Sequence, residues 1–266
     1  MKTPSPTAAL LLLLAPSLTA AHYLFPHFII NDTVTKEFEH VREHDNGFQP
    51  SWDDGAILAS PDLRCNKGAE NHMGAPTPAQ VVAGRDVVGF QTNLGTKIYH
   101  PGPVTASAPP PPRPVSSYAD SEDPFPFPPP SGNVAEYDGS GDWFKVYQLG
   151  TKDPWDGTDQ GWLTRDRSQF TFRLPAEIPK GQYLMRIEQM AVHPPYKAKQ
   201  FFMQCAHVEV DSQYNGSPPG PTIKLPGGYS KNDPAIQLDS WAKPKYAPMP
   251  KPDKMWPNED NFNKIL

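Results

Sequence analysis

The sequence predicts an all-β sandwich, on three observations. Apolar residues at a helical spacing are scarce along the chain. The 35 prolines and 19 glycines interrupt its 266 residues often. The stretches between them are short, and they alternate apolar with polar residues or are rich in β-branched and aromatic residues. Many short strands separated by turns are typical of two packed sheets.

The clearest strand candidates lie in the second half of the chain. Alternation and aromatic content predict strands over residues 143–149, 169–174, 181–192 and 200–210. An earlier segment, residues 80–90 (QVVAGRDVVGF), predicts a β-hairpin that turns at Gly84 and Arg85.

Two segments differ in composition from the predicted strands. Residues 101–130 contain twelve prolines. Because proline cannot donate to a strand ladder, this stretch is predicted to be a long loop insertion with polyproline character, and such loops are usually functional or disordered. The tail, residues 243–266, is rich in proline and lysine and is expected to be an extended strap or a frayed end. A single domain over residues 22–242 remains.

The N-terminus predicts a signal peptide over residues 1–21. Lys2 is its only charge, five leucines follow from Leu10 to Leu14, and small residues run up to Ala21. This apolar run is too short to span a bilayer, and the small residues form a cleavage site. The mature protein is therefore expected to be secreted and extracellular, and to begin at His22.

Charge and cysteine content limit the possible partners. The formal net charge is −5 and the chain has no basic cluster, which argues against nucleic acid and anionic membranes as partners. Cys65 and Cys205 are the two cysteines, and in an oxidising compartment they most simply form one disulfide. That bond would stabilise the fold by about 4 kcal/mol in the chain-entropy description. Asn31 and Asn215 begin glycosylation sequons. A monomer is expected.

The expected mature terminus offers metal ligands. A terminal histidine presents two nitrogens, the free amine and ring Nδ1, which can chelate one ion. Nitrogen donors in a plane favour Cu(II), and the amine can lose its proton to so strong a metal. A third nitrogen would come from another histidine, and the candidates are His27, His40, His44, His72, His100, His193 and His207.

Two other classes of protein remain open, a glycoside hydrolase and a carbohydrate-binding sandwich. A hydrolase needs two carboxylates flanking the bond, but the acidic pairs Asp53-Asp54 and Glu122-Asp123 lie in apparent loops. A binding module would use a row of exposed aromatic residues. Neither class explains a terminal histidine.

Several motifs, in the same order along the chain, resemble one known family. They are residues 22–31 (HYLFPHFIIN), 63–66 (LRCN), 100–104 (HPGPV), 139–146 (GSGDWFKV), 178–193 (IPKGQYLMRIEQMAVH), 200–205 (QFFMQC) and 226–230 (PGGYS). The chain resembles the fungal cellulose-active lytic polysaccharide monooxygenases, auxiliary activity family 9, over residues 22 to 242.

The resemblance implies an immunoglobulin-like or fibronectin III-like antiparallel β-sandwich with long loops. It implies one copper ion held by His22 and His100, with His193 and Gln200 beside the reacting oxygen and Tyr229 on a flat substrate face. The implied reaction is oxidative cleavage of cellulose or another β-1,4-glucan. It would use O₂ or H₂O₂ and a small-molecule or protein electron donor.

Two departures from the family pattern support an alternative. The family motif Q-x-Y reads Gln200-Phe201-Phe202 here, so Phe202 stands where a tyrosine hydroxyl lies near the axial position of copper. The proline-rich insertion also begins next to the expected ligand His100. The alternative function is a copper-binding relative without polysaccharide-cleaving activity.

Overall fold

The structure is a computed structural model, which describes residues 22–109, 132–193, 198–216 and 219–266. Outside these residues lie the predicted signal peptide, most of the proline-rich insertion and Ser217, the third residue of the sequon that begins at Asn215. In the described part, no helix is long and apolar enough to cross a membrane.

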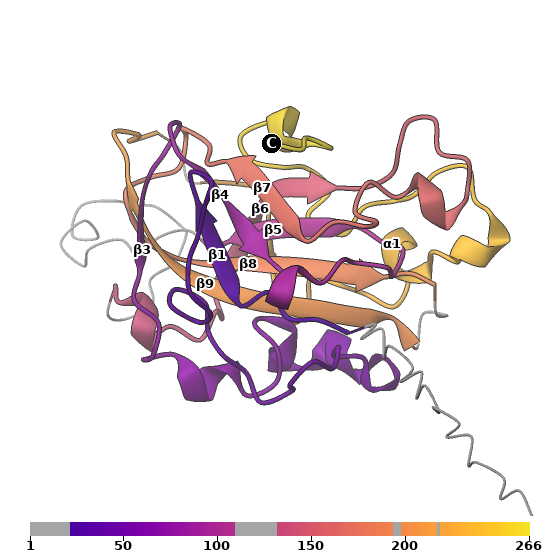
Figure 1. The fold of residues 1–266 in the computed structure, drawn as a ribbon, viewed down its shortest axis with the longest axis horizontal. Helices are drawn as coiled ribbons and strands as arrows, with labels where there is room; N and C mark the ends of the chain where they lie inside the picture. Colours follow the sequence, from indigo (N-terminus) through magenta and orange to yellow (C-terminus); the bar gives the residue numbers. More distant parts are fainter. Residues whose placement is uncertain (1–21, 110–131, 194–197, 217–218) are drawn as a thin grey trace, which may run out of the picture.

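Two β-sheets form the molecule (Figure 1), and the prediction of a β-sandwich is confirmed. The strands are β1 (His27–Ile30), β2 (Thr33–Val34), β3 (Ala79–Val82), β4 (Val87–Gln91), β5 (Val104–Ala108), β6 (Asp142–Leu149), β7 (Gln169–Arg173), β8 (Gly181–Ala191), β9 (Gln200–Asp211) and β10 (Thr222–Lys224). The helical segments are α1 (Pro234–Gln237) and short 3-10 turns at Asp53–Ala59, Pro61–Leu63, Ala69–His72, Asn93–Gly95, Val134–Glu136, Asp159–Gly161, Ser240–Ala242 and Glu259–Asn261.

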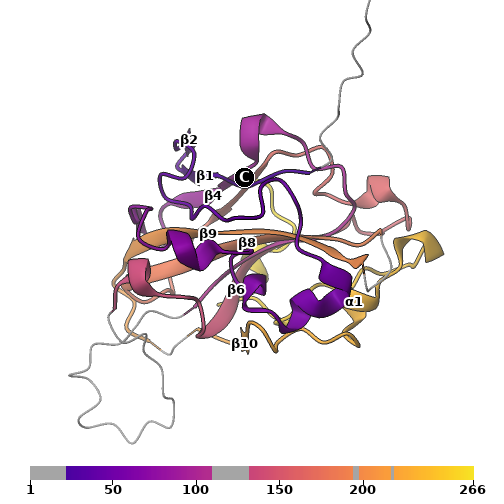
Figure 2. The same cartoon turned by 90° about the horizontal axis from the view of Figure 1, so that it is seen from below.

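The sheets have four and six strands, in the orders β2-β1-β4-β7 and β10-β6-β5-β8-β9-β3. Figure 2 shows β1, β2 and β4 as one layer and β8 and β9 as the layer beneath. All strand pairs are antiparallel except β3 with β9, which is parallel. The strands predicted over residues 143–149, 169–174, 181–192 and 200–210 correspond to β6, β7, β8 and β9.

The predicted hairpin over residues 80–90 is wrong. Both of its arms are strands, but β3 pairs with β9 in the larger sheet and β4 pairs with β1 and β7 in the smaller one. The turn therefore carries the chain from one sheet to the other. Gly84 has a φ of +74°, and a Cβ there would collide with Ala176, so this position needs glycine.

The larger sheet is buried on both faces. One face packs against the smaller sheet and contributes residues such as Ile187 and Val208 to the sandwich core. The other face supports a second apolar cluster beneath the loops, which includes Trp143, Leu184 and Met203. Because side chains alternate along a strand, β8 and β9 send successive residues to these two cores.

The disulfide between Cys65 and Cys205 is present, as the sequence predicts. It joins the loop that carries Cys65 to β9 across the second core. Arg186 on β8 strengthens the same junction, since its guanidinium donates to the carbonyl oxygens of Leu63 (2.9 Å) and Arg64 (2.8 Å).

The C-terminal tail runs along β6 and reaches β7 (yellow in Figure 1). The Trp256 N–H donates to the Lys145 carbonyl at 2.7 Å, and the Asn263 N–H donates to the Gln148 carbonyl at 2.9 Å. The buried Asn261 amide donates to the carbonyls of Val146 and Arg173, each at 3.0 Å. These bonds hold the tail as a strap on the domain.

Candidate metal centre

The end of the β8–β9 pair brings together the polar residues expected at the site. The register pairs Gln189 with Phe202 and Ala191 with Gln200. Because side chains alternate with a period of two, Gln200 and Phe202 lie on the sandwich side of β9, next to this end of β8. His193 lies two residues beyond the end of β8.

A rigid loop carries His100 to the same end. The Val192 N–H donates to the Pro101 carbonyl at 2.8 Å and the Met190 N–H donates to the Pro103 carbonyl at 3.1 Å, which ties the loop to β8. Gly102 has a φ of +148°, and a Cβ there would collide with the Met190 carbonyl oxygen. Glycine is therefore required for the loop to lie this close to β8.

Four of the expected residues form one cluster. The ring centroids of His22 and His100 are 6.0 Å apart. His193 stacks on His100 at 4.8 Å, and Phe202 lies 5.9 Å from His22 and 5.5 Å from His100. The three histidines and Gln200 are half-buried, whereas Phe202 is 2% exposed beneath them. The cluster therefore opens to solvent above an apolar base.

The residues fit a single metal ion held by nitrogen. Imidazole nitrogens bind such ions at about 2.0 Å, so two rings on opposite sides of one ion have centroids about 6 Å apart. In the described part of the chain, no group of three or more His, Cys, Asp or Glu side chains could hold a metal. Two histidine rings, together with the amine that His22 would expose once the predicted signal peptide is removed, would make a nitrogen donor set of the kind that copper favours.

Two polar atoms beside this pair add to the fit. His193 Nδ1 and Gln200 Oε1 are buried and have no hydrogen-bond partner among the described residues. Buried polar atoms are nearly always paired, so this edge of the cluster is suited to a small polar group. Burial lowers the pKa of His193, so the neutral ring offers one donor and one acceptor nitrogen at neutral pH.

A buried lysine supports this edge. Lys199 is 2% exposed and its ammonium donates to the carbonyl oxygens of Val192 (2.8 Å) and Leu238 (2.5 Å). Burial lowers its pKa to about 8. These bonds tie Lys199, which precedes Gln200, to Val192, which precedes His193, and to Leu238 after α1. The sequence did not distinguish Lys199 from a surface lysine.

The other candidate histidines have structural roles. Burial lowers the pKa of His44 to about 4 and that of His207 to about 3. His207 Nε2 accepts from Arg42 Nε at 2.6 Å. His27 and His72 lie near Glu37 and Asp45, and His40 bonds the Thr77 carbonyl.

The placement of Tyr229 does not support the substrate-face role expected for it. Tyr229 is 6% exposed within the second core, and its hydroxyl donates to Glu188 Oε1 at 3.0 Å. The loop that follows β10 folds over the outer face of the larger sheet and buries the ring.

Both sequon asparagines, Asn31 and Asn215, are exposed. Asn31 differs in that its Nδ2, the atom that would carry a glycan, donates to the buried Asp86 Oδ1 at 3.1 Å.

A buried tether that the sequence did not suggest links the two histidine segments. The Tyr23 hydroxyl donates to Gln189 Oε1 at 2.7 Å, and Gln189 Nε2 donates to the His100 carbonyl at 3.3 Å. The Tyr23 ring also stacks on Phe202 at 4.4 Å. Burial raises the pKa of Tyr23 well above its ordinary value, so the phenol keeps its proton. The tether thereby fixes His22 relative to His100.

Replacing Tyr23 by phenylalanine should weaken Cu(II) binding about tenfold or more, because groups that orient metal ligands typically have effects of this size. It should also destabilise the fold by about 1–3 kcal/mol, since Gln189 Oε1 loses its donor. Calorimetric copper titration and urea unfolding measure the two effects.

Tyr183→Phe is the matched control for this variant. Tyr183 is equally buried, and its hydroxyl donates to the Pro179 carbonyl at 2.7 Å, at the opposite end of β8. We expect a similar loss of stability with unchanged copper affinity. Equal copper affinities for the two variants would refute a positioning role for Tyr23.

The fold and this cluster define a β-sandwich protein with a nitrogen-donor site at the end of its longest strands. Residues 22–248 match Auxiliary Activity family 9 (formerly GH61). The chain belongs to this family, the copper-dependent lytic polysaccharide monooxygenases. The match begins at His22, where the mature chain is predicted to start.

Curated relatives carry the same family name. The chain is 36% identical over 228 residues to AA9 family lytic polysaccharide monooxygenase G of Aspergillus tamarii, covering 84% of this chain but only 62% of that protein. It is 34% identical over 241 residues to monooxygenase A of Aspergillus fumigatus, covering 88% and 76%.

Solved structures share the fold. A structure titled CvAA9A matches with a TM-score of 0.66 at 23% identity, covering 91% of this chain and all of that one. Cel61B from Hypocrea jecorina, titled a glycoside hydrolase family 61 member, matches with a TM-score of 0.66 at 18% identity, covering 88% of this chain and all of that one.

Proposed function

We propose that the mature protein, secreted and beginning at His22, cleaves cellulose or another β-1,4-glucan by hydroxylating a C–H bond next to the glycosidic linkage. The observation that carries the proposal is the cluster in which His22 and His100 face one another beside the unpaired polar atoms of His193 and Gln200. The hydroxylated product eliminates, and the chain breaks.

His22 and His100 would hold one copper ion, the former through its terminal amine and ring. Bound copper would supply the redox chemistry that uses O₂ or H₂O₂ with electrons from a small-molecule or protein donor. His193 would exchange a proton or hydrogen bond with the oxygen reactant, and Gln200 would orient it. Phe202 and Tyr23 exclude water from the base of the cluster, which strengthens the polar interactions above them.

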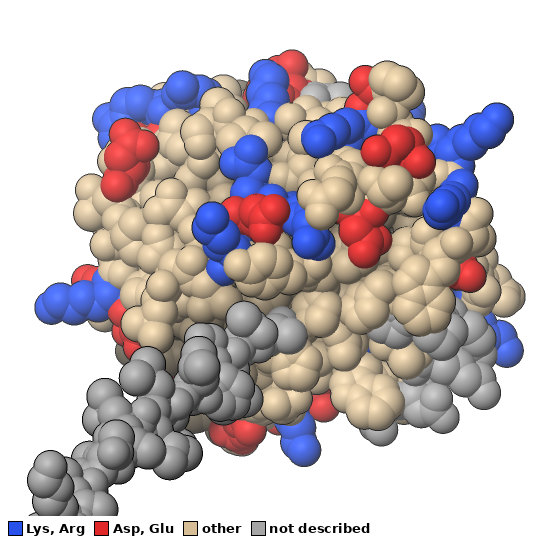
Figure 3. Space-filling view, turned by 45° about the vertical axis from the view of Figure 1, so that its right-hand side comes forward, with Lys and Arg blue, Asp and Glu red and all other residues tan. Residues whose placement is uncertain are grey.

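The charge distribution on one face of the molecule supports an uncharged polymer as substrate, and we propose that the protein acts as a monomer. On the face seen in Figure 3, acidic and basic side chains are intermixed over a largely uncharged surface. Such a face favours neither nucleic acid nor an anionic membrane.

The test uses protein secreted with His22 as its true N-terminus and loaded with one copper. It is incubated with glucans, xylan or chitin plus ascorbate, with and without H₂O₂, and products are identified by mass spectrometry. Oxidised oligosaccharides that free copper does not produce are expected. Tight copper binding without any such product would instead favour the alternative, a copper-binding relative that cleaves no polysaccharide.

Phe202 is the observation that keeps this alternative open. Its ring centroid lies 5.9 Å from that of His22 and 5.5 Å from that of His100, and the resemblance to the family aligns it with a tyrosine, whose oxygen phenylalanine lacks. Phe202→Tyr should therefore change the Cu(II) EPR spectrum, because it would place a phenol oxygen beside the two histidine rings that would hold the ion. Phe201→Tyr is the control, since Phe201 is equally buried but faces the second core. Identical spectra for both variants and the parent would count against Phe202 lying next to the bound copper.

A further inference from the structure

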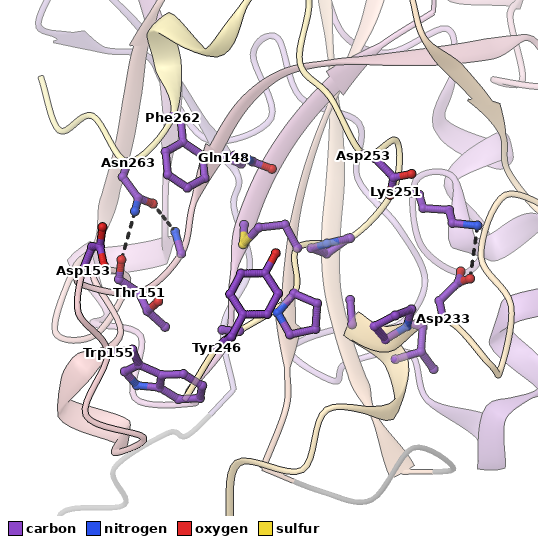
Figure 4. A pocket seen from close by; sticks show the side chains of 18 of the residues that line it. Gln148, Thr151, Asp153, Trp155, Asp233, Tyr246, Lys251, Asp253, Phe262 and Asn263 are labelled. Atoms are coloured by element: carbon purple, nitrogen blue, oxygen red, sulfur yellow. Dashed lines mark hydrogen bonds and ion pairs between the residues drawn. The ribbon is translucent and has the colours of Figure 1, made fainter. Parts of the chain in front are cut away.

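A cleft of about 740 Å³ is lined by residues other than those of the histidine cluster. Its walls are the loop after β6 (150–155), the turn that begins α1 (233–236) and two parts of the C-terminal strap (245–253 and 262–263) (Figure 4). Leu149, the last residue of β6, pairs with Val104 just after the His100 loop. The loop after β6, which forms one wall of the cleft, therefore begins at the same end of the sheet as the candidate metal centre.

Aromatic rings line one half of the cleft. Figure 4 shows Phe262, Tyr246 and Trp155 in this half. Tyr246 is 73% exposed and Phe262 is 42% exposed, so the fold leaves large ring surfaces in contact with water. Trp155 is held in place, because its indole N–H donates to the Thr158 carbonyl at 3.0 Å and its ring packs edge-on against Trp162. The aromatic surface is thus partly preorganised for a ligand.

The charged residues of the cleft balance one another. Three aspartates and three lysines line it: Asp153, Asp233, Asp253, Lys152, Lys245 and Lys251. Lys251 pairs with Asp233 at 3.2 Å, at the end of the cleft away from the rings in Figure 4. Asp153 and Asp253 are exposed, so their carboxylates can accept hydrogen bonds from a ligand. This balance disfavours ligands of strong net charge and favours an uncharged one with many hydroxyl groups.

We propose that this cleft is a second glycan-binding site, which takes a short stretch of an uncharged oligosaccharide. A pyranose ring has an apolar C–H face that can lie on the exposed rings of Tyr246 or Phe262, and hydroxyls at its edge that can donate to Asp153 or Asp253. The volume lies within the usual range of small-ligand sites. The site holds a glycan chain by contacts separate from those at the histidine cluster.

The experiment titrates the copper-free mature protein with cellohexaose by calorimetry. Tyr246→Ala should raise the Kd about tenfold, which corresponds to the loss of about 1.4 kcal/mol of stacking on the exposed ring. The side chain is exposed, so the variant should fold normally. Trp241→Ala is the matched control, because Trp241 is 71% exposed and lies outside the lining of the cleft. It should leave the Kd unchanged.

A further variant distinguishes glycan binding in the cleft from oxidative cleavage at the histidine cluster. His100→Ala should abolish oxidative cleavage but keep the Tyr246-dependent binding. The proposal is overturned if cellohexaose does not bind, if Tyr246→Ala binds it as well as the parent does, or if catechol or a polygalacturonate hexamer occupies the Tyr246-dependent site more tightly than cellohexaose.

Discussion

A protein that retains Ala21 ahead of His22 should bind Cu(II) more than about 100-fold less tightly than the mature chain. The added peptide bond removes the basicity of the His22 nitrogen, which leaves the two imidazole rings as the remaining donors. Removing groups that only support a ligand typically costs about 10- to 100-fold in affinity, so loss of a ligand should cost more. Calorimetric copper titration at constant pH measures the change.

The extended protein should remain folded, because His22 is half-buried at the surface and its neighbours are held by β1 and the Tyr23 tether. Enzymatic removal of the extra residue should restore the affinity, which is the control for damage during preparation. Unchanged affinity in the extended protein would mean that the His22 amine is not a ligand.

Arg186→Leu should lower the free energy of unfolding by about 3–5 kcal/mol, since breaking a buried ion pair leaves an uncompensated charge. Arg186 and Glu188 are each 1% exposed and paired on the outer face of β8. The substitution leaves Glu188 with the Tyr229 hydroxyl as its remaining partner and removes the donor from the Leu63 carbonyl. Urea unfolding measures the loss.

Two control variants test whether the burial of the charge causes this loss of stability. Lys180→Ala breaks the ion pair between Lys180 and Asp211, whose side chains are 70% and 59% exposed. It should lower the free energy of unfolding by at most about 1 kcal/mol. The double variant Arg186→Leu/Glu188→Leu should be more stable than Arg186→Leu alone, because it removes the isolated carboxylate. A double variant no more stable than the single one would show that lost packing, not the buried charge, dominates.

Much of the candidate centre could be predicted from the sequence. The signal peptide pattern identifies His22 as the expected terminus, and the motifs around residues 100–104, 178–193 and 200–205 identify His100, His193 and Gln200. The two cysteines allow one intramolecular pair. Each of these inferences rests on residues that are close together in the chain, except the disulfide, for which two cysteines leave a single possible pairing within the chain.

The errors and omissions have a common cause. Alternation over residues 80–90 correctly indicates two strands, but a period of two does not show which sheet a strand joins. Likewise, nothing near Tyr229 in the chain shows that a second apolar core covers the outer face of the larger sheet. Tyr23 and Gln189 are separated by 166 residues, and no local pattern connects them.

The sequence by itself therefore determined the class of fold, the disulfide and the residue types of the candidate metal centre, because strand periodicity, cleavage signals and short motifs are encoded locally. Only the tertiary structure decided that the chain crosses between sheets at Gly84, that Tyr229 is buried and that Tyr23 is tethered through Gln189 to the His100 loop. It also decided that the strap and the loop after β6 form a cleft. These features depend on strand order and on packing between segments far apart in the chain, where the free energy comes from contacts that no local pattern specifies.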